Sequence, residues 1–283
     1  MKYFTVDLKD EFPQLKTGSP RLHCYINDCY KGGEGRKTPA MLAIAGGGYG
    51  GVCFDREGEP IAFCFLKEGY SAFALEYSVA PAHFPTQLLE AAAAMIYIRR
   101  NAEKWSINPD WVAVSGYSAG GHLAASLGTL CLEGEVENTF SVDPHLAIPN
   151  AMVLSYSVIT SDPSFSHSGS IENVTGNAPV GSELYKKVSL ENHVNGSTPP
   201  AYIWHTANDE LVPVKNSLAF AAALADHGIK YELHVFPSGS HGLATSSFAT
   251  HDGIMDPVTA LSHKWVSEAA GFLNTVWFGN PIV

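Results

Sequence analysis

Residues 116–120 read Gly-Tyr-Ser-Ala-Gly and lie between two contrasting segments. An apolar, β-rich run precedes them at 111–114, and a segment of small residues follows at 121–130. This order predicts a strand, a sharp turn and a helix, with Ser118 at the turn. The glycines relieve the crowding of such a turn, and the helix directs free N–H groups at negative charge forming beside the serine. We therefore expect Ser118 to be a nucleophile; a strand–helix corner that only packs closely is the alternative.

The rest of the chain alternates apolar β-rich runs with helical patterns, which is typical of a parallel sheet with helices on both faces. We expect eight strands, the first two antiparallel, at 4–8, 22–27, 41–45, 72–76, 111–115, 151–156, 201–205 and 231–236. The expected helices are one capped by Asp55 and running to about Glu68, then 86–104, 213–227 and 259–276. The predicted fold class is α/β, with a mostly parallel eight-stranded sheet.

Two regions interrupt this alternation. Residues 133–149 are polar and irregular, and 161–200 are rich in serine, asparagine, glycine and proline, with one short helix expected near 182–188. A loop of that length in a compact domain is usually functional. Because it leaves the carboxyl end of a strand, we expect it to overhang the site as a small lid. The predicted organisation is a single domain over 1–283 with a lid-like insertion at about 157–200.

Composition and charge limit the class of protein. About 46% of the 283 residues are apolar and 16% are charged, which allows a large core. No apolar run of about 18 residues predicts a membrane helix, and residues 1–7 do not resemble a secretory signal. Five cysteines without a C-x-x-C pair indicate reduced thiols, a cytoplasmic location and no metal. A net charge of −11 argues against nucleic acid or an anionic membrane as partner, and we expect no cofactor.

A glycine run, Gly-Gly-Gly-Tyr-Gly-Gly at 46–51, directly follows the expected strand 41–45. Its letters match the G-x-G-x-x-G of a dinucleotide site, but that motif must open a helix in a βαβ unit and be followed by an acidic ribose-binding residue. Here the next strand ends in Glu76-Tyr77, without a typical continuation, and no Walker lysine follows the glycines. We favour a loop whose amides face the serine turn and stabilise an oxyanion.

A serine nucleophile needs a base and an orienting carboxylate. His241 lies in a glycine-flanked loop just after the strand 231–236, and Asp209 follows the strand 201–205. Glu210 is the alternative carboxylate, and an ordinary loop histidine is the alternative interpretation of His241. The order serine, aspartate, histidine is that of α/β hydrolases, and all three residues follow strands at the edge where open α/β sheets bind ligands.

On these motifs the chain resembles the α/β-hydrolase superfamily, and within it esterases related to the hormone-sensitive-lipase group and to bacterial acetyl esterases and acetylxylan esterases. The resemblance runs from about residue 41 to 241 and into the last helix. It rests on the segments 46–51 and 55–60, on Gly-Tyr-Ser-Ala-Gly-Gly-His at 116–122, on 205–213 and on Gly-x-His-Gly at 239–242.

The resemblance implies a catalytic triad and an oxyanion hole. The triad would consist of Ser118 as nucleophile, His241 as base and Asp209 as its orienting group. The oxyanion donors would be the amides of Ala119 and of Gly47 or Gly48, and the expected substrate contacts are Tyr49, Tyr117 and His205.

One position departs from the lipase pattern. The H-G-G-G motif begins with histidine, and Ala45 stands there in this chain. The loop must therefore be braced in another way, through Tyr49 or the segment 55–59, although Tyr49 could equally pack beneath the lid.

The expected reaction is hydrolysis of short-chain acetyl esters, of sugars or other small polar alcohols, through an acyl-enzyme. Two alternatives stay open: a serine peptidase of the prolyl-oligopeptidase type, and a non-catalytic ligand-binding protein with a hydrolase fold. A small-molecule ester is the expected partner, and a homodimer is an open possibility.

Overall fold

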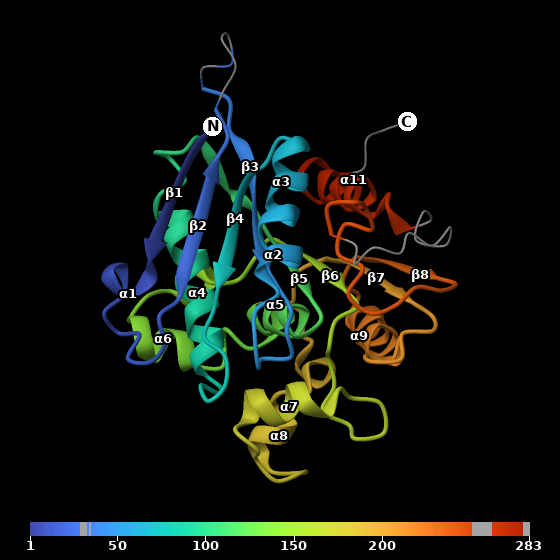
Figure 1. The fold of residues 1–283 in the computed structure, drawn as a ribbon. Coiled ribbons are helices and arrows are strands. Elements are labelled where there is room, and N and C mark those ends of the chain that lie inside the picture. Colours follow the sequence, from blue (N-terminus) through green and yellow to red (C-terminus); the bar gives the residue numbers. More distant parts are fainter. Residues whose placement is uncertain (29–32, 34, 251–261, 280–283) are drawn as a thin grey trace.

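The computed structural model describes residues 1–28, 33, 35–250 and 262–279, and their strands form one eight-stranded sheet (Figure 1). The sheet has the order β1-β2-β4-β3-β5-β6-β7-β8. β1 and β2 run antiparallel, β2 is antiparallel to β4, and the strands from β4 to β8 are parallel. The predicted fold class is confirmed. The strands are β1 Lys2–Asp7, β2 Arg21–Ile26, β3 Thr38–Ile44, β4 Ser71–Glu76, β5 Ile107–Tyr117, β6 Ala151–Ser155, β7 Ala201–Thr206 and β8 Tyr231–Phe236.

Helices cover both faces of the sheet. None of those in the described residues is long and apolar enough to cross a membrane. The described helices are α1 Leu8–Glu11, α2 Phe54–Glu57, α3 Glu59–Lys67, α4 Thr86–Arg100, α5 Ala119–Thr129, α6 Glu135–Phe140, α7 Ser168–Thr175, α8 Glu183–Lys187, α9 Lys215–Asp226 and α11 Trp265–Phe278, with 3₁₀ turns η1 Pro144–Leu146 and η2 Leu190–His193.

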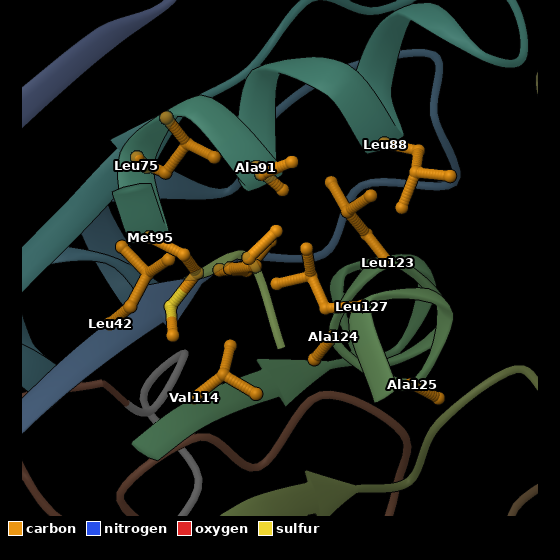
Figure 2. Close-up of a cluster of buried hydrophobic side chains, with 14 of the residues drawn as sticks. Leu42, Leu75, Leu88, Ala91, Met95, Val114, Leu123, Ala124, Ala125 and Leu127 are labelled. Atoms are coloured by element: carbon orange, nitrogen blue, oxygen red, sulfur yellow. The ribbon is translucent and has the colours of Figure 1, made fainter. Parts of the chain in front are cut away.

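The alternation of side chains along each strand divides the core between the two faces. Leu42 and Val114 belong to a cluster that includes side chains of α4, α5 and α9, whereas their neighbours Met41 and Ala113 belong to one that includes side chains of α3 and α11. Figure 2 shows the first of these clusters, in which side chains of α4 meet those of α5 over the sheet. Because every residue of α5 is buried, the helix that begins beside Ser118 is held from all sides.

The helix predicted over 55–68 is wrong in its start and its continuity. The chain forms two helices, α2 and α3, which break at Gly58. Pro60 lies in the first turn of α3, where its missing N–H and fixed φ suit a helix start and prevent continuation from α2. Asp55 lies within α2 rather than capping it, since Cys53 is the N-cap residue.

Other element boundaries also differ from the prediction. The helix expected over 86–104 ends at Arg100, and the region 133–149 contains α6 and η1. The helix expected over 259–276 is described as α11, and positions 259–261 lie outside the described residues.

The segment between β6 and β7 lies beyond the carboxyl ends of the central strands, where Figure 1 shows α7 and α8 in yellow. The predicted short helix is α8, whereas α7 and η2 were not predicted. Asn173 of α7 donates from Nδ2 to the carbonyl oxygen of Gly48 over 2.9 Å, which fixes this segment to the glycine loop. Its role as a lid, and the division into one domain with an insertion, stay predictions.

Candidate active site

Ser118 occupies the turn between β5 and α5 in a conformation that side chains rarely adopt, with φ 53° and ψ −122°. The glycines on either side are required by close backbone contacts. A Cβ at Gly116 would lie 2.4 Å from the oxygen of Gly120, and a Cβ at Gly120 would lie 2.2 Å from the oxygen of Ile44. The structure therefore explains why the strained serine has a glycine two positions before and after it.

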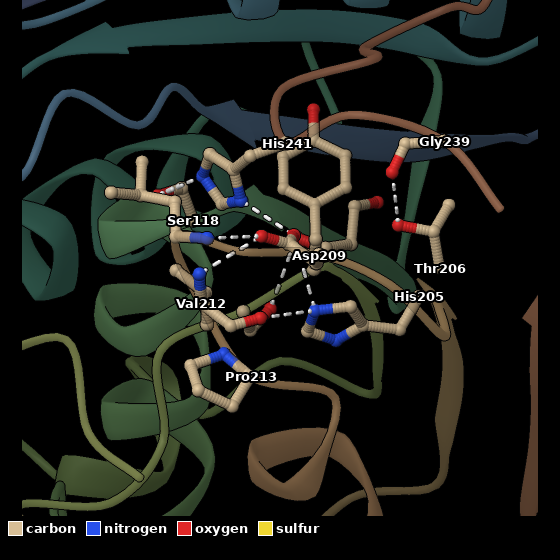
Figure 3. A network of polar contacts seen from close by, with 12 residues as sticks. Ser118, His205, Thr206, Asp209, Val212, Pro213, Gly239 and His241 are labelled. Atoms are coloured by element: carbon tan, nitrogen blue, oxygen red, sulfur yellow. Dashed lines mark hydrogen bonds and ion pairs between the residues drawn. The ribbon is translucent and has the colours of Figure 1, made fainter.

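Three residues from distant parts of the chain meet at this turn (Figure 3). The hydroxyl Oγ of Ser118 lies 2.9 Å from Nε2 of His241. On the other side of the imidazole, Nδ1 lies 2.7 Å from Oδ2 of Asp209. Ser118 is only 7% exposed, and the side chain of Asp209 is fully buried. An imidazole that donates from Nδ1 to the carboxylate leaves Nε2 free to accept the serine proton.

The surroundings of Asp209 keep it charged. Its Oδ1 accepts hydrogen bonds from the amides of Leu211 and Val212, at 3.0 and 2.9 Å. Burial alone would raise the pKa of Asp209, but hydrogen bonds from His205, His241 and the Val212 amide hold that pKa well below its usual range. A permanent negative charge therefore faces Nδ1 of His241.

His205 belongs to this support and its side chain is fully enclosed by protein, which corrects its expected role in substrate binding. The side chain is fully buried, and its Nε2 donates to the oxygen of Val212 over 2.9 Å. The same N–H lies 3.3 Å from Oδ2 of Asp209, and Nδ1 accepts from Ser217 Oγ. His205 thus lies behind the aspartate, on the side away from His241.

Tyr49 and Tyr117 also differ from their expected roles as substrate contacts, because both side chains are buried. Tyr117 ends β5 on the face that α11 covers, and its ring packs against Trp265. Tyr49 is 1% exposed and donates its hydroxyl to Nδ1 of His122 over 2.8 Å. Since Nε2 of His122 must donate to the oxygen of Val188, its Nδ1 is an acceptor, and burial lowers the pKa of this histidine to about 4.

The glycine loop lies against the same turn, since a Cβ at Gly46 would lie 2.8 Å from Cβ of Ser118. Gly47 and Gly48 have φ values of 125° and 64°, a conformation that favours glycine. Within residues 1–28, 33, 35–250 and 262–279, no acceptor pairs with the amides of Gly47, Gly48 or Ala119. The loop is held at Gly46, whose amide donates to Oε2 of Glu57 over 2.8 Å. The segment 55–59 therefore contacts the loop at the position next to Ala45.

Two further residues, Tyr156 and His167, lie near the site. Tyr156 follows β6, and its ring stands edge-on to the ring of His241, with centroids 5.0 Å apart. His167 caps α7, where its Nδ1 accepts from the amide and hydroxyl of Ser170. Burial, and then the charge of His241, lower the pKa of His167. Both residues lie in irregular segments, where no periodicity reports which way a side chain points.

No group of three or more histidine, cysteine, aspartate or glutamate side chains in the described part of the chain could hold a metal ion. A cavity of about 1060 Å³ lies at the opposite edge of the sheet, where Thr38 begins β3 and Trp277 of α11 forms part of the wall. This cavity is separate from Ser118, which lies at the carboxyl edge.

An eight-stranded α/β sheet with a serine, histidine and aspartate at its carboxyl edge defines the α/β hydrolases. Comparison with known proteins specifies the family. The chain belongs to the BD-FAE family, which matches residues 28–224. Among solved structures, the acetyl ester-xyloside bifunctional hydrolase from Caldicellulosiruptor lactoaceticus aligns with a TM-score of 0.79 at 32% identity, over 97% of each chain.

Two curated relatives extend this comparison. Endo-1,4-beta-xylanase B of Butyrivibrio fibrisolvens is 35% identical over 233 residues, which cover 81% of this chain and 35% of that protein. Acetylxylan esterase of Xylanibacter ruminicola is 29% identical over 258 residues, 90% of this chain and 49% of that protein. The chain therefore spans half the length or less of the curated relatives it matches.

Proposed function

We propose that this chain is a serine esterase that hydrolyses short acyl esters, with acetyl esters of sugars as the preferred class. The observation that carries the proposal is the contact series from Ser118 Oγ to His241 Nε2 and from His241 Nδ1 to Asp209 Oδ2, at 2.9 and 2.7 Å. These are hydrogen-bond distances at which a base can accept the proton of a nucleophile.

The reaction follows from these positions. His241 takes the hydroxyl proton as Ser118 Oγ bonds to the ester carbonyl carbon, and the carbonyl oxygen becomes an oxyanion. When the tetrahedral intermediate collapses, the bond to the alcohol oxygen breaks and His241 returns the proton to the alcohol. Water then gives a proton to His241 and attacks the acyl carbon. The bond from that carbon to Ser118 Oγ breaks, the acid leaves, and His241 returns the proton to Oγ.

The oxyanion is stabilised by N–H donors that need no rearrangement. We assign this role to the amides of Ala119 and of Gly47 or Gly48, which have no acceptor in the described part of the chain. The N-terminus of α5 adds a partial positive charge behind Ser118. Each such donor is worth about 3–4 kcal/mol of the barrier.

Asp209 fixes the proton of His241 on Nδ1 and stabilises the imidazolium that forms in each step. The fixed proton leaves the lone pair of Nε2 directed at Ser118. His205 and the Val212 amide complete the bonds of the carboxylate, so that it stays charged while the imidazole gains and loses a proton.

The substrate class rests on the segment 157–200 and on the relatives. The side chains of this segment nearest the glycine loop are polar, since Asn173 binds the oxygen of Gly48, and a Cβ at Gly48 would lie 3.8 Å from Ser170 Oγ and 3.9 Å from His167 Cε1. A polar wall suits a hydrophilic alcohol such as a sugar. Relatives named acetylxylan esterase and acetyl ester-xyloside hydrolase support the same class.

The test compares wild type and Ser118→Ala on p-nitrophenyl acetate. We expect kcat to fall by about 10⁶-fold while the fold, followed by circular dichroism, is retained. Acetate, butyrate and octanoate esters and acetylated xylose then test the substrate class. A Ser118→Ala variant within tenfold of the wild-type rate would refute the nucleophile. A preference for octanoate would refute the short acyl group, and turnover of aminoacyl anilides alone would favour a peptidase.

A further inference from the structure

A buried carboxylate joins the two loops that carry the proposed chemistry. Glu57, at the end of α2, is only 1% exposed. Its Oε2 accepts from the amide of Gly46 over 2.8 Å, and its Oε1 accepts from the hydroxyl of Tyr156 over 2.8 Å. Gly46 begins the glycine loop, so one oxygen of this carboxylate holds the loop that supplies the oxyanion donors.

The other oxygen acts on the loop of His241 through Tyr156. The hydroxyl oxygen of Tyr156 accepts from the amide of Ala244 over 2.9 Å, and Ala244 follows His241 in the same loop. The carbonyl oxygen of Ala244 accepts from Nε1 of Trp265 over 2.8 Å. Together with the edge-on contact between the Tyr156 ring and the imidazole, these bonds determine where His241 stands.

We propose that Glu57 is a positioning residue that couples the oxyanion loop to the histidine loop through Tyr156. This inference rests on the proposed function, because it concerns the placement of groups that act in ester hydrolysis. It gives a reason for Ala45 in place of the lipase-type histidine: the amide next to that position is held by Glu57 instead.

The bond directions explain why a carboxylate is needed. Both oxygens of Glu57 face donors, namely the Gly46 amide and the Tyr156 hydroxyl. Glutamine would place its NH₂ group against one of them. Tyr156 could accept from that NH₂ group only by turning its own O–H away from residue 57, and because its oxygen also accepts from Ala244, the buried O–H would lose its acceptor. A glutamine at 57 therefore releases either the glycine loop or the histidine loop.

The experiment uses Glu57→Gln, Tyr156→Phe, the double variant and a matched control, Glu90→Gln. Glu90 is also a buried carboxylate that accepts two hydrogen bonds, from the amide and hydroxyl of Ser78, and it has no hydrogen bond to the described residues of either loop. Measurements are kcat and KM for p-nitrophenyl acetate, Tm, and the inhibition constant of a trifluoromethyl ketone, which forms a tetrahedral oxyanion with the serine.

We expect Glu57→Gln to lower kcat by about tenfold to 100-fold with KM changed by less than about twofold, since it displaces transition-state donors. The ketone should bind more weakly by a similar factor. The kcat of the double variant should be no more than about twofold below that of Glu57→Gln, because both substitutions break the same set of coupled contacts. Glu90→Gln should keep kcat within about twofold.

Several results would overturn the coupling. One is a Glu57→Gln enzyme with wild-type kcat and ketone affinity. A second is a double variant in which the factor lost in kcat equals the product of the factors lost in the two single variants. If Glu57→Gln does not fold, Tyr156→Phe decides, since a folded Tyr156→Phe enzyme with wild-type kcat would refute the coupling. Failure of the proposed function itself is distinguishable, because wild type would then be inactive or Ser118→Ala active.

Discussion

Replacing Asp209 with asparagine tests the arrangement of the triad most sharply, because the surrounding bonds decide how the new amide must lie. Oδ1 accepts from two backbone amides, those of Leu211 and Val212, so the amide oxygen must occupy that side. The NH₂ group then takes the place of Oδ2, which lies 2.7 Å from Nδ1 of His241. Two donors cannot face each other at that distance.

The imidazole can relieve this conflict only by moving its proton to Nε2. Nε2–H then points at Ser118 Oγ and cannot accept the hydroxyl proton. The wrong tautomer of a triad histidine lowers kcat by about 10⁴-fold, or about 5.4 kcal/mol of barrier. We expect this loss in Asp209→Asn with little change in KM for p-nitrophenyl acetate.

Glu210→Gln is the matched control, because Glu210 is the adjacent carboxylate and is exposed. Its kcat/KM should equal that of wild type within about twofold, and Tm should be recorded for all three proteins. Two results would refute the reasoning: an Asp209→Asn enzyme within tenfold of wild type, or a Glu210→Gln enzyme that loses as much activity as Asp209→Asn.

Three further predictions concern stability. Gly120→Ala places a Cβ 2.2 Å from the backbone oxygen of Ile44 and should lower the free energy of unfolding by about 3 kcal/mol, whereas an unchanged Tm would contradict this packing. Burial raises the pKa of Glu90 from its ordinary 4.5 to about 7. Its protonated form therefore adds fully to the free energy of unfolding below pH 4.5, and this contribution is lost as the pH rises through 7. Between pH 4.5 and 7, the free energy of unfolding of wild type should therefore fall by up to about 3 kcal/mol more than that of Glu90→Gln. The same pH dependence of this free energy in both proteins would contradict the prediction. His122→Phe leaves the buried hydroxyl of Tyr49 without its acceptor, so the free energy of unfolding, measured with denaturant, should fall by about 2–3 kcal/mol. A fall of less than about 0.5 kcal/mol would show that this hydrogen bond contributes little to stability.

The sequence predicted the sheet well because strands follow local patterns. Apolar β-rich runs give all eight strands to within a few residues, and the helix over 213–227 was close to the observed α9. The break at Gly58 differs from the prediction because Asp55 and the carboxylates after it match a single helix start, whereas Pro60 lies in the first turn of a second helix.

The expected substrate contacts were the weakest part of the prediction. Tyr49 and Tyr117 adjoin motif residues, and adjacency in sequence suggested a place in the cleft. In the fold, Tyr117 is the last residue of β5 and its ring packs against Trp265 of α11, whereas Ser118 lies in the turn that follows the strand. His205 is likewise close to Asp209 but lies behind it.

By itself, the sequence determined the strand–turn–helix at Ser118, the order of serine, aspartate and histidine, and the parallel sheet that brings their loops to one edge. These features depend on local spacing and on covalent order, which a sequence contains directly. Only the tertiary structure decided which side chains face the cleft and which support it from below, as Glu57 and Tyr156 do. That choice depends on how separate elements pack against each face of the sheet, and contacts between residues 99 positions apart leave no local pattern.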